Sequence, residues 1–461
     1  MQLVDPPAET RLFHEIPGPR QIPWLGNALS FVRKDRLEWL AGLSAEHGHL
    51  IRMKLFNEPI LLVQEADWLQ YILQSHYKDF TKQGRVIEKG KAVLGNGLFT
   101  SEGEFWRKQR RLAQPAFYKR RLEGLALTMV ECIEAMLKEW EQYAASGKVV
   151  DIGNEMMRLT LHVVTQSMFG GSLTEEEYMA FADTFPALLR ETNRRILNPF
   201  PFMDHVRPGR AAQYRRNIER LDAMIYRMIE ERRASGEDGD DLLGMLMAAR
   251  DEDSGEGMSE QQLRDEVMTI FIAGHETTAQ ALCWALLMLH RHPEIQTKLQ
   301  SEAVQVLGER SPTMEDFMAM PYGLKVFKET LRLYPPVAIF VRRALKSFEM
   351  SGYKVPAGTG FIIPPYMMHR DPRFWDDPKR FDPERFTPER EKERPKFVYF
   401  PFGGGPRICI GTKFAMMEAV LALGMMLRRF RVEPVDPDNV EMDLTMTLRP
   451  RGGLPARIKI R

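Results

Sequence analysis

The sequence contains few cysteines and no excess of either charge. Only Cys132, Cys283 and Cys409 occur in 461 residues, a number too small and too odd for a disulfide framework and typical of a reducing compartment. The 64 lysines and arginines face 63 aspartates and glutamates, which leaves a net charge of +1. So small a net charge argues against a dedicated nucleic-acid binder. These counts predict a cytoplasmic protein that does not act on nucleic acid.

The sequence also lacks a signal segment and an uninterrupted membrane-spanning run. Its first residues are charged and polar, and Pro17, Pro19 and Pro23 follow early. The most apolar stretch, Val267–Leu289, is interrupted near its middle by Glu276, and a carboxylate at the bilayer centre costs roughly 2.5–3.5 kcal/mol. We therefore expect a buried core helix and a soluble chain without a membrane anchor. A helical membrane protein is the alternative, which solubility without detergent would exclude.

Internal repeats, low-complexity tracts and domain linkers are not evident either. Hydrophobic residues make up 44% and charged residues 28% of the chain, which is ordinary for a globular protein. The 28 methionines and 26 phenylalanines suit an adaptable apolar interior. We expect one large domain over residues 1–461.

The hydrophobic pattern predicts a mainly α fold with a small β portion. After a rigid, proline-rich lead-in over 15–27, alternating residues from Ile51 and an apolar run at Ile60–Val63 predict a β-hairpin. Val337–Arg343 and Phe361–Ile363 fit a small sheet. Helices are predicted at about 35–47, 104–113, 122–250 with breaks near 147, 170–171, 196–209 and 236–241, 260–290, 324–333 and 412–430.

Ten residues near the C-terminal end form the most informative stretch. They are Phe402, Gly403, Gly404, Gly405, Pro406, Arg407, Ile408, Cys409, Ile410 and Gly411. Three consecutive glycines suit a backbone that bends sharply or approaches something large and flat. Cys409 stands where the loop becomes a helix, and a helix N-terminus favours an ionised thiol. Such a thiolate is either a nucleophile or a metal ligand. The alternative is a small buried hydrophobe in a glycine-rich turn.

A second candidate site is the segment Ala273–Thr278 in the middle of the long helix. Small residues at 273 and 274 leave space beside the helix. Glu276 next to the Thr277 hydroxyl can open the local hydrogen-bond ladder and admit water. The alternative is a satisfied polar patch inside a long helix.

Two further pairs of side chains have helical spacing. Trp106 and Arg110 lie four residues apart and suit an acidic ligand group, although a solvated basic helix face explains them as well. Glu329 and Arg332 lie three apart and can form an ion pair, which on a surface is worth little.

Together these motifs resemble the cytochrome P-450 family over essentially the whole chain. Phe-x-x-Gly-x-Arg-x-Cys-x-Gly is similar to the haem-ligand loop, Ala-Gly-x-Glu-Thr-Thr to the oxygen-activation segment, and Glu-x-x-Arg with the later Arg385 to a buried structural ion network. The resemblance implies the P-450 fold and haem b, with Cys409 as the iron ligand. It implies a role for Glu276 and Thr277 in proton delivery.

The resemblance also implies which other residues contact the haem. Arg342 matches a propionate-binding position, and Arg343 is its close rival. The residues that the resemblance assigns to the haem or its propionates are Trp106, Arg110, Ala273, Arg342, Phe402, Arg407 and Gly411.

The function implied is that of a monooxygenase that inserts one oxygen atom from O₂ into a small lipophilic substrate. No flavin or nicotinamide fingerprint is present, so electrons would come from a separate ferredoxin or flavodoxin-type donor with its reductase. The basic residues at 107–121 and at Arg428–Arg429 would dock this donor, or else form solvated helix faces.

Two other haem proteins, a haem-thiolate peroxygenase or isomerase and a non-catalytic haem-binding sensor, are alternatives with their own tests. A peroxygenase or isomerase would turn over with peroxide alone, but the Glu276–Thr277 pair argues against it. A haem sensor would show six-coordinate iron with two protein ligands. The apolar loop at 198–208, which a simple helix connection also explains, and the segment at 83–98 are expected to line the substrate pocket.

Overall fold

The computed structural model describes residues 11–32, 36–171, 174–198, 200, 208–236, 241–250 and 255–461. The chain forms two compact units. Unit 1 comprises Met1–Glu88, Val337–Lys379 and Glu393–Cys409; unit 2 comprises Lys89–Pro336, Arg380–Lys392 and Ile410–Arg461. Because the chain passes from one unit to the other five times, neither is a continuous stretch. The expectation of a single domain over 1–461 stays a prediction.

Unit 1 contains the larger sheet. Its strands lie in the order β2 (Leu50–Leu55), β3 (Glu58–Val63), β9 (Gly360–Ile363), β6 (Phe340–Ala344) and β4 (Phe80–Thr81). Only the β3–β9 pair is parallel. Buried Ile51 and Met53 alternate with Arg52 and Lys54 along β2, as expected of a strand with one face in the core. The predicted hairpin and the small sheet are both confirmed.

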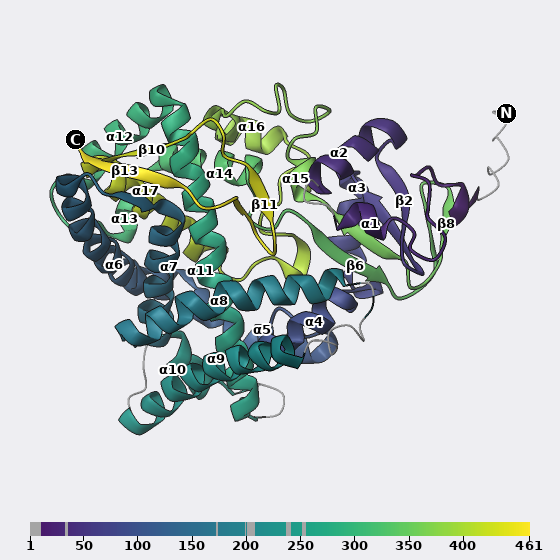
Figure 1. The fold of residues 1–461 in the computed structure, drawn as a ribbon, viewed down its shortest axis with the longest axis horizontal. Coiled ribbons are helices and arrows are strands. Elements are labelled where there is room, and N and C mark those ends of the chain that lie inside the picture. The colour runs from purple at the N-terminus through teal and green to yellow at the C-terminus, as the bar shows by residue number, and fades with distance from the viewer. Residues whose placement is uncertain are drawn as a thin grey trace. The chain divides into compact units, whose positions relative to one another are not determined.

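The remaining elements of unit 1 are short. A second sheet has the order β1 (Arg11–Leu12), β8 (Tyr353–Val355) and β7 (Phe348–Met350). The helices are α1 (Ala28–Phe31), α2 (Arg36–His47), α3 (Ala66–Gln70) and α15 (Pro365–Met368). Figure 1 shows α2 and α3 beside the sheet strands. The helix predicted at about 35–47 is confirmed over Arg36–His47, and residue 35 lies outside the described residues.

Unit 2 is mostly helical. Its helices are α5 (Gly103–Ala113), α6 (Lys119–Ser146), α7 (Ile152–Phe169), α8 (Glu175–Leu197), α9 (Pro208–Ser235), α10 (Leu242–Ala248), α11 (Glu260–Arg291), α12 (Pro293–Leu307), α13 (Met314–Met318), α14 (Pro321–Leu333) and α17 (Thr412–Arg429). Two more helices, α4 (Arg85–Leu94) and α16 (Pro388–Glu393), cross a unit boundary. This content confirms the mainly α fold class.

Residues at the helix ends explain where several helices start and stop. Ser259 caps α11, because its hydroxyl accepts from the Gln262 amide while the Gln262 side chain accepts from the Ser259 amide. Asp151 caps α7 through the Gly153 amide. α6 and α7 end at Gly147 and Gly170, which adopt left-handed φ angles of 65° and 59°.

Helix α11 forms the centre of unit 2. Nearly every residue from Leu263 to Leu289 is buried, and α7 packs closely along it (Figure 1). The prediction of a long core helix is confirmed. Among the helices that the structure describes, none combines the length and apolar character needed to cross a bilayer.

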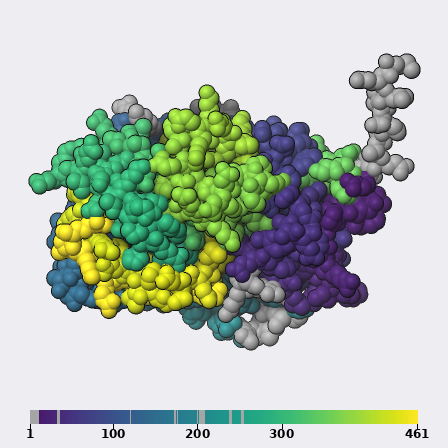
Figure 2. Space-filling view, turned by 90° about the horizontal axis from the view of Figure 1, so that it is seen from above, coloured from purple at the N-terminus to yellow at the C-terminus, as the bar shows by residue number. Residues whose placement is uncertain are grey.

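The strands of unit 2 come from its C-terminal part and from one segment between helices. β10 (Phe430–Pro434), β13 (Pro455–Ile460) and β5 (Val149–Asp151) form an antiparallel sheet, and β11 (Met442–Leu444) and β12 (Leu448–Pro450) form a hairpin. Figure 2 shows the C-terminal residues, in yellow, at the surface beside α12, where Arg461 hydrogen-bonds Gln300.

Two predicted features fall largely outside the described residues. The apolar loop at 198–208 is described only at Asn198, Phe200 and Pro208. The side chains of Lys119 and Arg120, part of the basic run, are also not described.

Candidate active site

The cysteine loop is a tight turn that only glycine can form. Gly403 and Gly405 adopt left-handed φ angles of 74° and 66°. A Cβ atom at Gly405 would lie 1.9 Å from the carbonyl oxygen of Leu73, so the backbone of the loop lies directly on the π-helical segment Tyr71–Ser75. The Cys409 amide donates to the carbonyl of Phe402 at 3.0 Å and closes the loop.

This closure presents the thiol of Cys409 at the surface of unit 1. Cys409 is exposed, whereas Cys132 and Cys283 are buried. Burial raises the pKa of Cys132 to about 12, which leaves that thiol inert. Since cysteine is among the most buried residue types, exposure at the end of a constrained loop sets Cys409 apart. α17 begins three residues later, at Thr412.

The chain leading into the loop is anchored inside unit 1. The Phe400 amide donates to Nε2 of the fully buried His369 at 3.0 Å. Phe402 and Arg407 are both partly exposed, on either side of the glycines. Gly411, the residue before α17, accepts from the Ala415 amide at 2.9 Å and has an ordinary φ of −84°.

Arg342 and Arg343 are neighbours on β6 and therefore face opposite sides of the sheet. Arg343 forms an ion pair with Glu58 and donates to the carbonyl of Gly358 at 2.9 Å. Arg342 Nη1 donates to the carbonyl of Val341, the residue before it, at 2.7 Å. Of the two candidates for the propionate-binding arginine, Arg343 thus forms an ion pair with a carboxylate of its own sheet.

In unit 2, the long core helix has one open face at its centre. Ala273 is exposed, and Ile272, Gly274 and Thr277 are partly exposed, although the helix is buried before and after them. Ala273 and Thr277 are four residues apart and share a face. The Thr277 hydroxyl donates to the carbonyl of Ala273 at 2.8 Å. A flat group has room to lie against this face.

Glu276, one residue earlier, points away from that opening into the protein. Its side chain accepts a hydrogen bond from the Thr447 hydroxyl at 2.8 Å, and both residues are buried. Burial raises the pKa of Glu276 to about 7, while Thr447 and the positive charge of Arg449 limit the rise. A carboxyl with such a pKa both gives and takes a proton at neutral pH.

The sequence did not point to Thr447 or Arg449 as partners of Glu276. Both lie in the β11–β12 hairpin, 171 residues after the glutamate in the case of Thr447. A threonine and an arginine in a short hairpin have no distinctive pattern, and only the contact made by the fold identifies them.

Trp106 and Arg110 lie on one face of α5, as their spacing predicts. Trp106 is buried and Arg110 is partly exposed. Arg110 Nε donates to Gln114 Oε1 at 2.9 Å, which orients its guanidinium along the helix.

Glu329 and Arg332 form a buried ion pair, as predicted. Their side chains are 0% exposed, and two hydrogen bonds of 2.7 and 2.8 Å join them. The Asp382 amide donates to Glu329 at 2.8 Å, and Arg385 Nε lies 3.5 Å from the same carboxylate. Burial raises the pKa of Glu329, and Arg332 opposes that shift. The downstream arginine of the predicted network is therefore confirmed as its third member.

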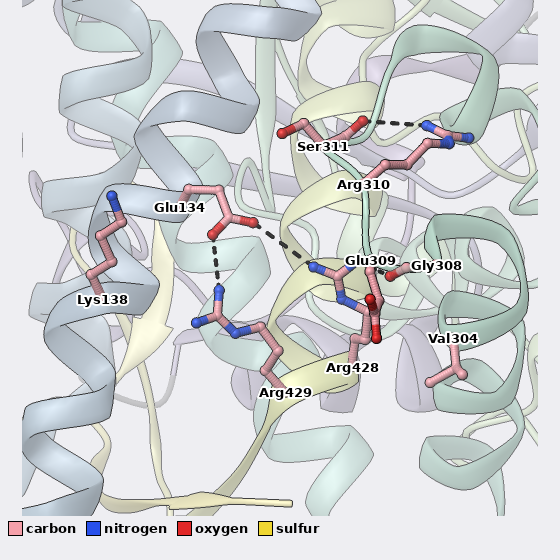
Figure 3. A pocket seen from close by; sticks show the side chains of 9 residues that line it. All are labelled: Glu134, Lys138, Val304, Gly308, Glu309, Arg310, Ser311, Arg428 and Arg429. Atoms are coloured by element: carbon pink, nitrogen blue, oxygen red, sulfur yellow. Dashed lines mark hydrogen bonds and ion pairs between the residues drawn. The ribbon is translucent and has the colours of Figure 1, made fainter.

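Arg428 and Arg429, by contrast, line a separate open cavity of about 720 Å³ on unit 2 (Figure 3). Both point toward Glu134, which lies 2.8 Å from Arg429 and 3.8 Å from Arg428. Arg429 also pairs with Glu141, and Arg428 donates to the carbonyl of Gly308. Much of their charge is thus balanced within unit 2.

Comparison with known proteins gives a consistent result over the whole chain. The sequence profile of the cytochrome P450 family matches residues 16–454. Cyclooctatin synthase of Streptomyces melanosporofaciens is 36% identical over 97% of this chain and 96% of its own. Cyclooctat-9-en-7-ol 5-monooxygenase of the same organism is 32% identical over 90% and 89%, and pentalenene oxygenase of Streptomyces avermitilis 32% over 91% of each chain.

Proposed function

Because this chain belongs to the cytochrome P450 family, it is a haem-thiolate monooxygenase that binds haem b, and we propose that Cys409 is the ligand of the haem iron. The observation that carries this assignment is the exposed thiol at the end of a glycine turn. The two other cysteines are buried, and burial holds the pKa of both thiols above the usual range.

The proposed haem contacts use residues whose chemistry fits a flat macrocycle with two carboxylates. The exposed face at Ala273 gives room for the ring, and Phe402 and Gly411 flank the ligand cysteine in sequence. Trp106, Arg110, Arg342 and Arg407 supply an N–H donor and three guanidinium groups for the propionates. The ion pair of Arg343 with Glu58 favours Arg342 over Arg343 for this role.

The haem supplies the activation of O₂, and the protein supplies access and protons. We propose that the Thr277 hydroxyl, at the open face of α11, passes protons onward and that Glu276 reloads it from the protein side. The pKa of about 7 at Glu276 supports this role, because proton transfer is most effective when the pKa lies near the working pH.

Electrons would reach this enzyme from a separate ferredoxin or flavodoxin-type protein with its reductase. The basic residues of α5 support docking of an acidic donor, because Arg107, Lys108 and Arg111 accompany a single acid, Glu104, in this helix. We place the enzyme in the cytoplasm, where a reducing environment suits a chain whose three cysteines form no disulfide.

The substrate is a small lipophilic molecule in our proposal. The names of two relatives, cyclooctat-9-en-7-ol 5-monooxygenase and pentalenene oxygenase, specify cyclic unsaturated compounds. Of the classes that suit an apolar pocket, these names favour a terpenoid. A spectral-shift screen of lipophilic compounds against the purified protein would test this.

The assignment of Cys409 is tested by replacing the thiol and following the haem spectrum. In Cys409→Ser, the reduced carbonyl complex should lose the red-shifted Soret band that thiolate ligation produces, and oxygenation should stop. Cys132→Ala, which removes a buried thiol of unit 2, should retain both. A normal thiolate-type band in Cys409→Ser would overturn the assignment.

A further inference from the structure

A hydrogen bond joins the proposed proton carrier to the C-terminal hairpin. The hydroxyl of Thr447 donates to Glu276 Oε1 at 2.8 Å, and Thr447 and Glu276 are only 5% and 6% exposed. We propose that Thr447 is a positioning residue of the oxygenation reaction, which holds the Glu276 carboxyl in place and keeps it able to exchange protons at neutral pH. This inference rests on the proposed role of Glu276.

The position of Thr447 is fixed by the residue that follows it. The Leu448 amide donates to the carbonyl of Pro336 at 2.9 Å, and the Leu448 carbonyl accepts from the indole N–H of Trp284 at 3.0 Å. Trp284 is buried in α11 and stacks on Tyr334, with ring centroids 4.1 Å apart. The backbone at 448 is therefore held on both sides, and the Thr447 hydroxyl is directed at one place on α11.

Among the groups around Glu276, Thr447 does most to lower the pKa of its carboxyl group. Burial is the strongest effect and raises the pKa of the carboxyl group. The hydrogen bond from Thr447 is the largest effect that lowers this pKa, and the charge of Arg449 lowers it less. Arg449 is itself paired with Asp443 at 3.1 Å and donates to Thr445, so its field at Glu276 is partly balanced. No other titratable group of the described residues shifts the pKa of Glu276.

The neighbouring titratable groups on α11 and α17 are held toward their neutral forms. Burial lowers the pKa of His275 to about 4, and its ring lies among Phe181, Phe185 and Phe271. Burial also raises the pKa of Glu418, on α17.

The hydrogen bond suits both halves of a proton-transfer cycle. When Glu276 gives its proton toward Thr277, the carboxylate that forms keeps a donated hydrogen bond from Thr447. A proton from solvent then restores the acid, so the glutamate returns to its starting form while the oxygenation consumes the proton that it delivered. Without the hydroxyl, burial alone would keep Glu276 protonated to higher pH and slow the release of its proton.

The experiment compares holoenzyme carrying Thr447→Val, which has nearly the same shape without the hydroxyl, with Thr447→Ser, which keeps it. Two quantities are followed against pH: the ratio of product to hydrogen peroxide, and the infrared carboxyl band of Glu276, identified by its loss in Glu276→Gln. Thr447→Val should move both midpoints upward by about one pH unit. Thr447→Ser should behave like the native enzyme.

The outcomes separate this inference from the role of Glu276. If Glu276→Gln abolishes the pH dependence while Thr447→Val leaves both midpoints unchanged, the role of Thr447 is overturned and that of Glu276 stands. An equal shift in the valine and serine variants also overturns it, because it would reflect packing and not the hydroxyl. If Glu276→Gln leaves the pH profile of turnover unchanged, both proposals fail.

Discussion

Glu276 and Thr277 are adjacent on α11 and yet have different surroundings. Successive helical residues point about 100° apart, so the glutamate faces the buried hairpin while the threonine faces the open side at Ala273. In the proposed mechanism, the buried side chain stores a proton and the one at the open side delivers it.

Replacing Thr277 should uncouple oxygen consumption from product formation. Proton transfer by a positioned group contributes roughly 10²–10⁴-fold, and because Glu276 would remain, we expect product formation in Thr277→Ala to fall by about tenfold to a hundredfold while peroxide rises. Haem content should be unchanged, and Thr277→Ser should stay close to the native enzyme. Coupled turnover in the alanine variant, measured as product per O₂ consumed, would rule out the delivery role.

Arg332 forms a buried ion pair with Glu329, so we expect it to stabilise the fold and not to take part in the chemistry. In Arg332→Ala, the buried carboxylate of Glu329 would lose its main partner, and breaking a buried pair costs about 3–5 kcal/mol. We expect a large drop in thermal stability and in haem content. Arg451→Ala, which removes an exposed pair with Glu441, should change the melting temperature little. A stable Arg332→Ala holoenzyme would contradict this account.

At the scale of elements, α11 carries three consecutive buried ionisable residues, Arg264, Asp265 and Glu266. Arg264 pairs with Asp222 of α9. The carboxylate of Asp265 accepts from the Asn96 amide at 2.7 Å, and a carboxyl oxygen of Glu266 accepts from the Leu98 amide at 2.9 Å. The loop after α4 is therefore held by side chains of the central helix, within the segment expected to line the substrate pocket.

The stability of the folded protein should depend on pH through Glu266, which binds this loop. Burial raises the pKa of Glu266 to about 8 from an ordinary value of 4.5. Between these two pH values the folded protein keeps a proton on Glu266 that the unfolded chain loses. The stability that protonated Glu266 contributes to the fold is therefore fully present below pH 4.5 and is lost as the pH rises to about 8. At about 1.4 kcal/mol per pKa unit, the effect amounts to a few kcal/mol.

Glu266→Gln should remove this dependence, since its amide oxygen can still accept from Leu98 but does not ionise. The variant should gain a few kcal/mol in free energy of unfolding relative to the native enzyme between about pH 5 and pH 8. Glu104→Gln, at an exposed position of α5, should show no such gain. A constant difference between Glu266→Gln and the native enzyme across this range would contradict the predicted titration.

The sequence predicted the motifs that are local and not the contacts that are distant. The glycine turn before Cys409, the helix that carries Glu276, and the Glu329–Arg332 pair all follow from spacing within short segments, whereas Arg385 was expected only from the family resemblance. Thr447 and the amides of Asn96 and Leu98 do not, because their partners are reached only when hairpin or loop packs on α11. The Arg428–Arg429 run was open to two readings, and only the fold shows that Glu134 pairs with both.

At the scale of the whole molecule, the charges nearly cancel. A net charge of +1 gives no strong overall field, so the acidic electron donor that we propose would have to be attracted by a local surface. α5 and the end of α17 are both rich in arginine, but the glutamates that pair with Arg428 and Arg429 come from α6. On α5, Arg107 and Lys108 pair with Glu104 and Glu256, which are themselves mostly exposed.

Electron transfer should therefore depend on α5 more than on the end of α17. At low ionic strength, Arg111→Ala on the exposed side of α5 should slow reduction by an acidic ferredoxin about three- to tenfold, and the difference should shrink as salt screens the charges. Arg429→Ala should leave the rate nearly unchanged, since its charge is balanced by Glu134 and Glu141. Stopped-flow reduction at several salt concentrations measures both. Equal losses in the two variants would mean that the donor does not distinguish these surfaces, and that docking through α5 is wrong.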